Sequence, residues 1–499
     1  MLSYLLFLLL ALTGAILQFF ILRYELRMFQ QNSYRVERFL RWYLGGRNFF
    51  GATLSFFKRE IVKLPLVYTA RVKRLIVSDL LLTYLLFGLL LYMISWVEGY
   101  DFVSVFTRPW AALLAFAPLL LLSKALLLLA NLVNTPVEKA IVRWYYKDAK
   151  KKIDSHKGLI IIGVTGSYGK TSTKNYLYRI LSEKYNTLVT PGNFNTTLGV
   201  VRTIREKLEP YHQVFIVEMG AKQVGDIQEI CDLVHPHIGI VSSVGPMHLE
   251  TFGSFANIQK TKFELVRSLP CDGLAVINAD SQGIASYQEV PTHCNVIRYG
   301  VKNGEYKAEN LQYSTEGSSF DLEGVSYKTN LLGESNILNI LASCAVARHL
   351  GLSERQIQMA VAKLQQVEHR LFVSRQGAVT VIDDAYNSNP EGASMALDVL
   401  RDIKGGRKIL VTPGFVELGE RQYDECYNLG MKAAQCADFL VIVNKYNRQA
   451  IQKGALEGGL NEENILCVDS LNQAVAALRY LFAPGDVVLY ENDLPDTFK

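Results

Sequence analysis

The first 230 residues contain no cysteine, and none of the seven cysteines further along the chain stands in a CxxC pair. Disulfide frameworks and zinc sites use closely spaced thiols, so this pattern argues against both and predicts reduced thiols in a reducing compartment. The chain also lacks a GxGxxG motif, which leaves a dinucleotide cofactor unsupported. The cysteines are Cys231, Cys271, Cys294, Cys344, Cys426, Cys436 and Cys467.

Most of the chain lacks an excess of charge of either sign, and the net charge of +5 arises locally. Between Arg23 and Val77, twelve Lys and Arg residues stand against three Asp and Glu residues. The remaining chain is close to balance, which argues against nucleic-acid binding. Such a basic segment is typical of the cytoplasmic flank of a membrane helix, where it is attracted to anionic lipid. Within it, Tyr24–Tyr43 mixes arginine with aromatic residues and is predicted to be an interfacial helix.

Apolar residues concentrate before residue 135, in three runs long enough to cross a bilayer. These runs are about Leu2–Leu22, Leu80–Val97 and Trp110–Val133, the last interrupted by Ser123 and Lys124. The first run lacks a basic start and a signal-peptidase site, so we expect it to be retained. Because a charge inside a bilayer is costly, Lys124 is expected to snorkel or to face another helix.

The positive-inside rule sets the expected topology. A cytoplasmic basic segment places the N-terminus outside, and after three crossings the chain beyond Lys150 lies in the cytoplasm, where ATP is. We therefore divide the chain into a membrane region (1–150), a central domain (151–374) and a C-terminal domain (375–499).

A nucleotide site is predicted directly after the membrane region. Leu159–Val164 forms a short apolar strand, Thr165–Thr171 reads TGSYGKT, and a helical run follows from Ser172 to Lys184. In such a P-loop the glycines let backbone N–H groups approach phosphates, the lysine reaches the β- and γ-phosphates, and the threonine hydroxyl binds Mg²⁺. Lys170 and Thr171 are the candidates for these two roles.

Two further strands are expected to end beside the P-loop. The strand Gln213–Val217 ends in Glu218, a carboxylate placed where a Mg²⁺ ligand belongs. The strand His237–Val244 leads to His248, and the helix that follows carries Lys262. Each residue alone is more often structural, but together with a P-loop they predict a metal-assisted phosphate site.

Strand-like and helical runs alternate in the last quarter of the chain, which predicts a parallel, Rossmann-like sheet. The overall expectation is an α/β protein, with a P-loop ATPase domain and a Rossmann-like domain behind an α-helical transmembrane region. The expected C-terminal strands are Val379–Ile382, Lys408–Val411, Phe439–Val443, Asn464–Val468 and Asp486–Tyr490.

From about Gly158 onward the chain resembles the Mur ligase family, and within it the branch that adds D-alanyl-D-alanine to UDP-N-acetylmuramoyl-tripeptide. The resemblance rests on ten motifs in the same order along the chain. They are TGSYGKTS (165–172), TPGNFNTTLG (190–199), EMGAKQVGDI (218–227), VGPMHLETFGS (244–254), TKFE (261–264), VINAD (276–280), GESNILN (333–339), HRL (369–371), IDDAYNSNP (382–390) and VELGE (416–420).

The resemblance implies a role for each matching residue, with ATP and two Mg²⁺ ions as the bound groups. Lys262 matches the family's carbamylated lysine, and Arg370 matches an arginine that reaches the γ-phosphate. The implied catalytic residues are Lys170, His248, Lys262 and Arg370; the implied nucleotide-binding residues are Gly166, Ser167, Gly169, Lys170, Thr171, Ser172, Asn278, Asn339, Arg370, Asp384, Tyr386 and Asn389; and the implied metal ligands are Thr171, Glu218, His248 and carbamylated Lys262.

The implied reaction is amide formation through an acyl phosphate, in which little covalent work falls to the protein. The family's UDP-gripping N-terminal domain is missing here, and membrane runs stand in its place. The acceptor carboxylate is therefore expected on a cell-envelope precursor, with a lipid-linked precursor as one form, at the bacterial cytoplasmic membrane, with a separate amine donor and contact with membrane lipid. The stretch Tyr490–Pro495, where this branch has a basic motif, is acidic and suggests a cationic or free-amine donor.

Two other functions are compatible with the sequence. One is a polyglutamate-type amide ligase, which also pairs a Mur-like ATPase with a membrane segment, although the TPGNF and DDAYNSNP motifs favour the cell-wall branch. The other is a non-catalytic ATP-binding scaffold at the membrane. The sequence leaves the two substrates, the general base and a homo-oligomeric state open.

Overall fold

The computed structural model describes residues 2–44, 65–291, 293–314, 317–386 and 388–494. The chain divides into two compact units, one reaching Trp144 and one from Tyr145 to Leu494. The division falls inside one helix, α6, so the two units share a continuous stretch of backbone. Each unit is described by itself.

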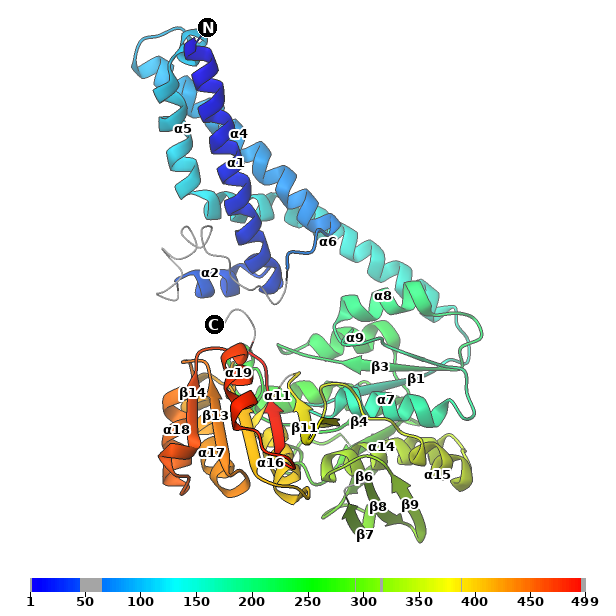
Figure 1. Ribbon diagram of the computed structural model, residues 1–499. Helices are drawn as coiled ribbons and strands as arrows, with labels where there is room; N and C mark the ends of the chain where they lie inside the picture. Colours follow the sequence, from blue (N-terminus) through cyan, green and yellow to red (C-terminus); the bar gives the residue numbers. More distant parts are fainter. Residues whose placement is uncertain (1, 45–64, 292, 315–316, 387, 495–499) are drawn as a thin grey trace. The chain divides into compact units, whose positions relative to one another are not determined.

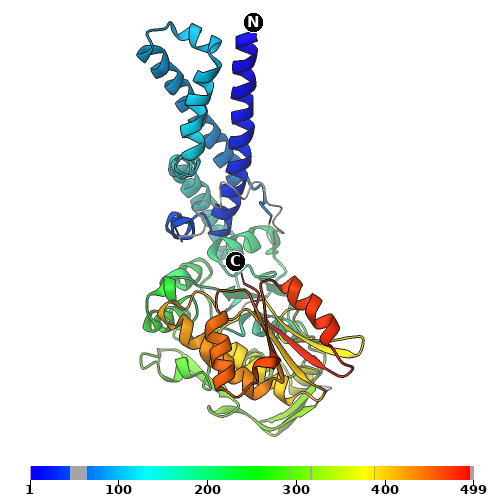
Figure 2. The ribbon, with the colours of Figure 1, turned by 60° about the vertical axis from the view of Figure 1, so that its left-hand side comes forward.

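The N-terminal unit is built of helices (Figures 1 and 2). Among the described residues, three of them, α1, α4 and α6, are long and apolar enough to cross a membrane. With a rise of about 1.5 Å per residue, α1 is longer than the roughly 30 Å of a hydrocarbon core. The helices are α1 (Leu2–Gln31), α2 (Val36–Leu44), α4 (Ala70–Val97), the 3₁₀ turn η2 (Phe102–Thr107), α5 (Pro109–Leu121) and α6 (Ser123–Asp154).

The third apolar run is not the single helix predicted over Trp110–Val133. The chain breaks at Leu122, and α5 and α6 run in different directions from there (Figure 1). The physical reason lies in the polar residues that interrupt the run, because Ser123 turns inward and its hydroxyl donates to Glu25 Oε1 at 2.7 Å. Lys124 faces another helix, as expected, and its Nζ lies 3.5 Å from the same carboxylate oxygen.

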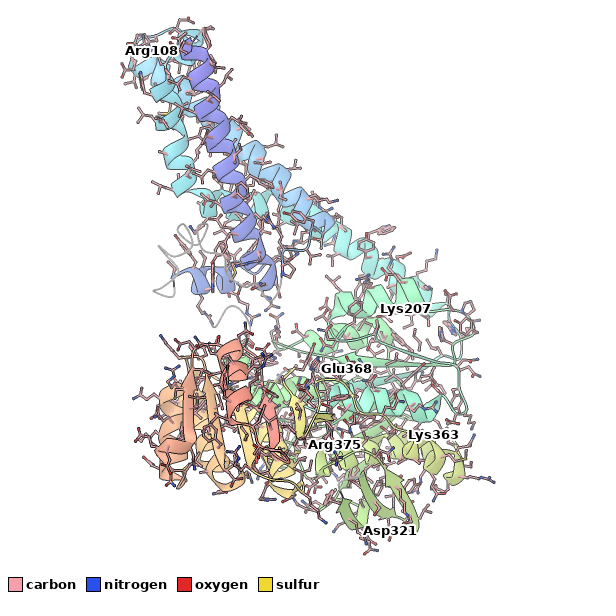
Figure 3. The ribbon with its side chains drawn as sticks, viewed as in Figure 1. Arg108, Lys207, Asp321, Lys363, Glu368 and Arg375 are labelled. Carbon is pink, nitrogen blue, oxygen red and sulfur yellow. The ribbon has the colours of Figure 1, made fainter. Side chains whose placement is uncertain are left out.

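The short link between α4 and α5 ends at Arg108, whose guanidinium lies 3.6 Å above the ring of Tyr100. Figure 3 labels Arg108 at the tip of the N-terminal unit. In the predicted topology this link lies outside the cytoplasm.

The central domain holds a nine-stranded sheet within the described residues, in the order β2-β3-β1-β4-β5-β6-β7-β8-β9. The strands from β1 to β6 pair in parallel, and β7, β8 and β9 form antiparallel hairpins. The strands are β1 (Ile160–Thr165), β2 (Thr187–Val189), β3 (Val214–Met219), β4 (Ile238–Val241), β5 (Leu274–Asn278), β6 (Asn295–Gly300), β7 (Tyr306–Ser314), β8 (Gly317–Leu322) and β9 (Val325–Thr329).

Helices cover both faces of this sheet. On one face α7 packs against α14, and Tyr176 and Leu177 are buried in that cluster. On the other, α8, α9 and the end of α6 bury a second cluster around Phe215. The helices are α7 (Lys170–Leu181), α8 (Thr197–Lys207), α9 (Asp226–Val234), α10 (Leu249–Phe252), α11 (Phe255–Lys262), α12 (Glu264–Arg267), α13 (Gln282–Ala285), α14 (Glu334–His349) and α15 (Glu354–Ala362).

The C-terminal domain has a second sheet, ordered β10-β11-β15-β12-β13-β14. Five of its strands pair in parallel, and they confirm the predicted Rossmann-like alternation. β10 is an antiparallel edge strand that begins at Phe372, before the predicted start of the domain at residue 375. The elements are β10 (Phe372–Gln376), β11 (Val379–Asp384), α16 (Pro390–Asp402), β12 (Lys408–Thr412), η3 (Gly419–Arg421), α17 (Gln422–Cys436), β13 (Phe439–Val443), α18 (Arg448–Glu457), η4 (Glu462–Asn464), β14 (Ile465–Val468), α19 (Leu471–Leu481) and β15 (Val487–Glu491).

The order of the central sheet positions the site. β1 lies between β3 and β4, so the carboxyl ends of three parallel strands meet at one edge of the sheet. The P-loop follows β1, Glu218 is near the end of β3, and His248 comes after β4. These are the three strand ends that the sequence predicts to converge.

Candidate active site

The P-loop is a tight turn that only glycine fits at its first bend. Gly166 has φ +155°, and a Cβ atom there would lie 2.1 Å from Ser242 Oγ. Gly169 has φ +78° and begins α7 in a left-handed conformation. Ser167 is buried, with its hydroxyl hydrogen-bonded to Gly245. The backbone is therefore held close and leaves the N-terminus of α7 available to an anion.

Replacing Gly166 by alanine is expected to weaken ATP binding at least about 10-fold. The new methyl group would displace Ser242 and add backbone strain of about 1–3 kcal/mol. Gly158→Ala is the control, because Gly158 also has positive φ (+83°) but open space around it. Nucleotide titration of both variants measures the difference, and equal affinities would contradict the argument.

Lys170 folds back over the P-loop. Its Nζ donates to Gly166 O at 2.6 Å and to Ser167 O at 3.2 Å. Burial lowers the pKa of Lys170 to about 8, with Glu218 opposing the shift and Arg370 adding to it. A buried ammonium group above a phosphate-binding loop is suited to neutralising a triphosphate.

Glu218 is buried at the end of β3 and surrounded by donors. Its Oε2 lies 2.8 Å from Lys174 Nζ, and its Oε1 accepts from Thr171 Oγ1 at 3.2 Å and from Asn195 Nδ2 at 3.1 Å. Burial acts to raise the pKa of Glu218, but Lys174 and Lys170 outweigh it and the net pKa is lowered. Glu218 is therefore a carboxylate at neutral pH, in contact with the P-loop threonine.

His248 is held by the C-terminal domain. It has φ +55°, and its Nδ1 pairs with the carboxylate of Glu417, which itself has φ +63°. Burial lowers the pKa of His248, and the nearby charges of Lys222 and Lys262 lower it further. The Glu417 carboxylate acts in the opposite direction but does not reverse the shift. A neutral imidazole with Nδ1 engaged offers Nε2 to a ligand. His248 and Glu417 are thus two non-glycine residues in the left-handed backbone region, and they contact each other. Backbone strain of this kind occurs at functional sites.

Lys262 ends α11 and is only 4% exposed. Its pKa falls to about 7 because burial disfavours the ammonium form and Lys170 adds a like charge. Lys262 and His248 also act on each other electrostatically. Within the described part of the chain, no group of three His, Cys, Asp or Glu side chains could hold a metal. A metal at this edge would therefore need an additional ligand.

The C-terminal residues predicted to close over the nucleotide lie in different settings. Arg370 lies 4.4 Å from the ring centre of Tyr386 and interacts electrostatically with Lys170 and Asp384. Burial raises the pKa of Asp384 to about 6, although the positive charge of Arg370 acts to lower it. The Tyr386 hydroxyl accepts from Asn193 Nδ2 at 2.6 Å, which connects it to the TPGNF loop. Asn389 caps α16 by accepting from the N–H of Gly392 at 3.0 Å.

The two asparagines that the resemblance implies for nucleotide binding lie in different places. Asn278 ends β5, donates to Ser242 O at 2.8 Å and lines the main cavity. Asn339 is buried in α14 beneath the P-loop, where it accepts from Thr173 Oγ1 at 2.9 Å. Ser172 is buried in the first turn of α7. Asn339 is not among the residues that line the cavity, and the hydrogen bond to Thr173 joins it to the first turn of α7.

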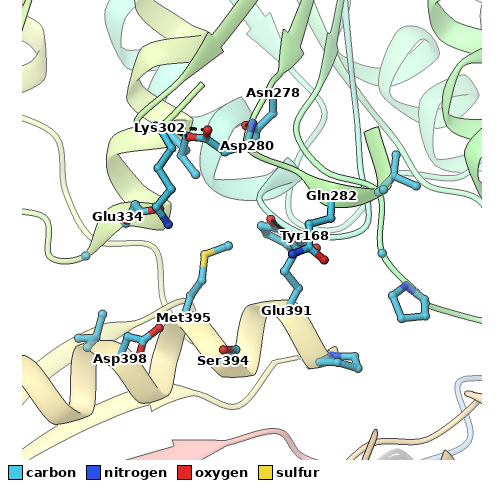
Figure 4. A pocket seen from close by; sticks show the side chains of 18 of the residues that line it. Tyr168, Asn278, Asp280, Gln282, Lys302, Glu334, Glu391, Ser394, Met395 and Asp398 are labelled. Atoms are coloured by element: carbon cyan, nitrogen blue, oxygen red, sulfur yellow. Dashed lines mark hydrogen bonds and ion pairs between the residues drawn. The ribbon is translucent and has the colours of Figure 1, made fainter. Parts of the chain in front are cut away.

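A cavity of about 1000 Å³ opens beside the P-loop, between the central and C-terminal domains. Figure 4 shows Asn278, Asp280 and Lys302 on one side and Glu391 and Met395 of α16 on the other. The cavity is large enough for a nucleotide by the range that small-molecule sites occupy. Its position joins the phosphate-binding loop to the domain that closes over it.

Sequence reasoning missed several of the residues that build this site. Tyr168, the variable position of the P-loop, donates from its hydroxyl to Glu391 Oε1 at 2.6 Å and so joins the two domains. Lys174 and Glu417, which pair with Glu218 and His248, were also missed. Tyr168 and Glu417 both stand inside quoted motifs, which was the available signal. Glu491 of the acidic stretch is buried and paired with Thr412 and Ser388, so it cannot face an amine donor.

Tyr168→Phe is expected to raise the KM for ATP about 5-fold with a smaller change in kcat. Losing one hydrogen bond costs about 1 kcal/mol, and it leaves the half-buried carboxyl group of Glu391 without the hydroxyl that Tyr168 donates. Tyr178→Phe is the control, because Tyr178 lies ten residues further along, on α7, and is 39% exposed. Steady-state kinetics in ATP measure both constants, and unchanged kinetics in Tyr168→Phe would contradict a role in closure.

Comparison with known proteins accounts for this arrangement. The Mur ligase middle domain matches residues 164–347, and the Mur ligase glutamate ligase domain matches residues 369–490. The chain is 32% identical over 363 residues to the UDP-N-acetylmuramoyl-tripeptide--D-alanyl-D-alanine ligase of Mycobacterium tuberculosis H37Rv, covering 66% of this chain and 70% of that protein. It is 33% identical over 284 residues to the Escherichia coli K12 enzyme of the same name, covering 56% and 62%.

Solved structures agree. MurF from Acinetobacter baumannii aligns with a TM-score of 0.64 at 27% identity, covering 70% of this chain and 76% of that one. MurF from Thermotoga maritima in complex with ADP aligns with a TM-score of 0.63 at 27% identity, covering 70% and 80%. The chain belongs to the Mur ligase family. It is an ATP-dependent ligase that forms amide bonds, and its central and C-terminal domains are similar to those of MurF.

Proposed function

We propose that this protein is a membrane-anchored, Mg²⁺-dependent amide ligase that joins an amino acid or peptide to a carboxylate of a cell-envelope precursor. The single observation that carries the proposal is the convergence of Lys170, Thr171, Glu218, His248 and Lys262 at one edge of the central sheet. The same chain carries three helices that are long and apolar enough to cross a membrane, counted over the described residues.

The residues at this edge fit two Mg²⁺ ions. The Thr171 hydroxyl and the Glu218 carboxylate are in contact and supply the oxygen ligands that Mg²⁺ prefers. Neutral His248 offers Nε2 to a second ion. Mg²⁺ would neutralise negative charge on the phosphates during transfer.

Lys262 would supply the missing ligand as a carbamate. A lysine must be a neutral amine to attack CO₂, and a pKa of about 7 makes the neutral form abundant at physiological pH. Carbamylation converts the side chain into an anion, which a metal cluster near His248 and Lys170 would stabilise.

The activity of this ligase is expected to fall as pH drops below about 7 and to recover partly on adding bicarbonate. The pKa of Lys262 is lowered to about 7, so acid converts the neutral amine to the ammonium form, which cannot react with CO₂. Initial rates measured from pH 6 to 8, with and without bicarbonate, test this. A pH profile that bicarbonate does not alter would count against the carbamate.

The chemistry follows from these positions. The acceptor carboxylate attacks the γ-phosphorus of ATP, the bond to ADP breaks, and an acyl phosphate forms. The amine then attacks the carbonyl carbon, loses a proton and expels inorganic phosphate. Lys170 and Arg370 neutralise the phosphoryl oxygens and hold them in line, and closure of the C-terminal domain excludes water. Asn278 and the cavity beside it would hold the adenine side.

Membrane anchoring is supported by the outer surfaces of α1 and α4. Leu8 is 62% exposed, Leu85 is 72% exposed and Trp96 is 78% exposed. Apolar surface of this extent on long helices is expected to contact lipid. With the basic segment after α1 in the cytoplasm, the N-terminus lies outside and the catalytic unit lies inside.

The acceptor is proposed to be lipid-linked. The family matches begin at residue 164, and apolar helices occupy the chain before that point. A membrane region instead of a UDP-gripping domain suits an acceptor that is already held in the bilayer. Equal turnover of a soluble UDP-muramoyl peptide and its lipid-linked form, by the protein in lipid nanodiscs, would overturn this part of the proposal.

The ligase activity itself is tested by ADP production from purified protein. We expect production that depends on both acceptor and amine, and Lys170→Ala to lower it about 10³-fold. Lys174 is unsuitable as a control because it pairs with Glu218, so exposed Lys260 serves instead. ATP binding without any turnover would support the scaffold alternative, and glutamate incorporation into a polymer would support the polyglutamate alternative.

A further inference from the structure

A buried lysine outside the P-loop joins three parts of the active site. Lys174 lies one turn after Lys170 on α7 and is 1% exposed. Its Nζ lies 2.8 Å from Glu218 Oε2 and donates to Gly192 O at 2.7 Å. Balancing the charge of Glu218 needs only the first of these contacts. The second contact reaches the loop between β2 and α8, residues 190–196, called here the 190–196 loop.

The 190–196 loop is fastened to the end of β3. Thr190, at its start, is buried and accepts a hydrogen bond from the N–H of Glu218 at 3.1 Å. Asn195 donates from Nδ2 to Glu218 Oε1 at 3.1 Å, and its carbonyl accepts from the N–H of Gly220 at 2.7 Å. The contact with Lys174 adds a hold on the part of the loop between these two residues.

The backbone of Gly192 is shaped for its contact with Lys174. Gly192 has φ +50°, and a Cβ atom there would meet nothing within 4 Å. Glycine is therefore favoured at this position by the left-handed backbone and not by crowding. This conformation lets an exposed residue present its carbonyl oxygen to a buried ammonium group.

The order of the central sheet places the 190–196 loop and the cavity at Asn278 on opposite sides of the P-loop. In the order β2-β3-β1-β4-β5, the P-loop follows β1, Asn278 ends β5, and the 190–196 loop follows β2. Among the described residues that line the cavity, none comes from this loop. In-line transfer brings the attacking oxygen to the γ-phosphorus from the side opposite ADP. The acceptor carboxylate is therefore expected to approach beside the 190–196 loop.

The loop also reaches the C-terminal domain. Asn193 Nδ2 donates to Tyr386 OH at 2.6 Å, and the guanidinium group of Arg370 lies 4.4 Å from the ring centre of Tyr386. Arg370 in turn acts electrostatically on Lys170 of the P-loop. A displacement of the loop would therefore disturb the groups that surround the γ-phosphate.

We propose that Lys174 is a positioning residue for the acceptor, because its ammonium group fixes the 190–196 loop to Glu218 and so keeps the acceptor carboxylate in line with the γ-phosphate. Lys174 acts through the loop and through Glu218, since its side chain is buried and its ammonium group is engaged by both. This inference rests on the proposed ligase function, but the order of the loop is measurable without acceptor or turnover.

Hydrogen–deuterium exchange of the full chain in lipid nanodiscs, with and without Mg·ADP, measures the order of the loop. We expect the amides of residues 190–199 to exchange about 10-fold faster in Lys174→Met, while those of β1 and β3 keep the wild-type rate. Wild-type exchange in the loop of this variant would overturn the proposal. If β1 and β3 also lose protection, the fold itself is lost, and Gly192→Ala decides instead.

Gly192→Ala strains the loop backbone but leaves the ion pair between Lys174 and Glu218 in place. It is expected to speed exchange in residues 190–199 about 3-fold. Gly324→Ala is the matched control, because Gly324 also has positive φ (+79°) and open space around it but lies between β8 and β9. Equal exchange in the loop of both glycine variants would contradict the proposal.

Kinetics separate positioning from general stability. With a lipid-linked muramoyl tripeptide as the acceptor probe, we expect Lys174→Met to lower kcat/KM for the acceptor about 100-fold and to leave the KM for ATP within about 2-fold of the wild type. Equal losses for acceptor and ATP would overturn a positioning role. A wild-type protein that makes no amide would contradict the proposed function, whereas the exchange measurement would still decide whether Lys174 fixes the loop.

Discussion

Replacing Lys262 by alanine is expected to lower amide formation about 10²- to 10³-fold while leaving ATP binding within a few-fold of the wild type. The variant removes the proposed carbamate, which contributes negative charge to the metal site, but leaves the P-loop unchanged. Because Lys262 is 4% exposed, its removal also leaves a buried space beside His248 and Lys170. ADP production and equilibrium nucleotide binding, measured separately, distinguish the two effects.

Two comparisons make the Lys262 result specific. Lys260→Ala removes an exposed lysine of the same helix and is expected to have little effect. A small carboxylate such as formate is expected to restore part of the activity of Lys262→Ala by entering the vacated space as a free anion. Lys262→Arg keeps a positive charge but cannot form a carbamate, so activity in that variant near the wild-type level would rule the carbamate out.

The P-loop could be predicted from sequence because its pattern is local. Gly166 and Gly169 are required by the turn itself, and the strand before and helix after them are adjacent in the chain. The order of neighbouring parallel strands then places Glu218 and His248 at the same edge, since parallel strands share the end at which their loops emerge. The local P-loop pattern and the rule for parallel strands were therefore sufficient to predict the P-loop and the positions of Glu218 and His248 beside it.

The partners of those residues could not be predicted, because they come from distant segments. Glu417 meets His248 only when the C-terminal domain closes on the central one. The Lys174 contact with Glu218 requires that α7 pack on β3, and the sequence gives no reason to choose Lys174 over its neighbours. The charged residues that shift the pKa values in the site, such as Lys174 and Glu417, are thus the hardest part of the site to predict from the sequence.

The membrane region illustrates the same limit. Composition identified apolar runs, and three helices among the described residues are long and apolar enough to cross a membrane. Composition did not identify the break between helices at Leu122. A mean hydropathy over the run includes Ser123 and Lys124 but carries no information on which side chains they contact.

Glu218→Gln is expected to lower ligase activity about 10²- to 10³-fold and also to destabilise the catalytic unit. The activity loss is expected because the variant removes the charge of the proposed metal ligand, whose carboxylate contacts Thr171. The stability loss follows because Lys174, 1% exposed, would keep a buried ammonium group without its carboxylate. Breaking one partner of a buried ion pair costs about 3–5 kcal/mol.

A double variant separates these two roles of Glu218. Lys174→Met in the Glu218→Gln background removes the orphaned charge while keeping a side chain of similar length, so stability should largely return. Activity should not return if Glu218 is the proposed metal ligand, because its carboxylate is still missing. Glu206→Gln is the matched control, since Glu206 is exposed and pairs with Arg202 on the surface of α8. Recovery of both stability and activity in the double variant would mean that Glu218 serves only to hold Lys174, and that the metal is bound elsewhere.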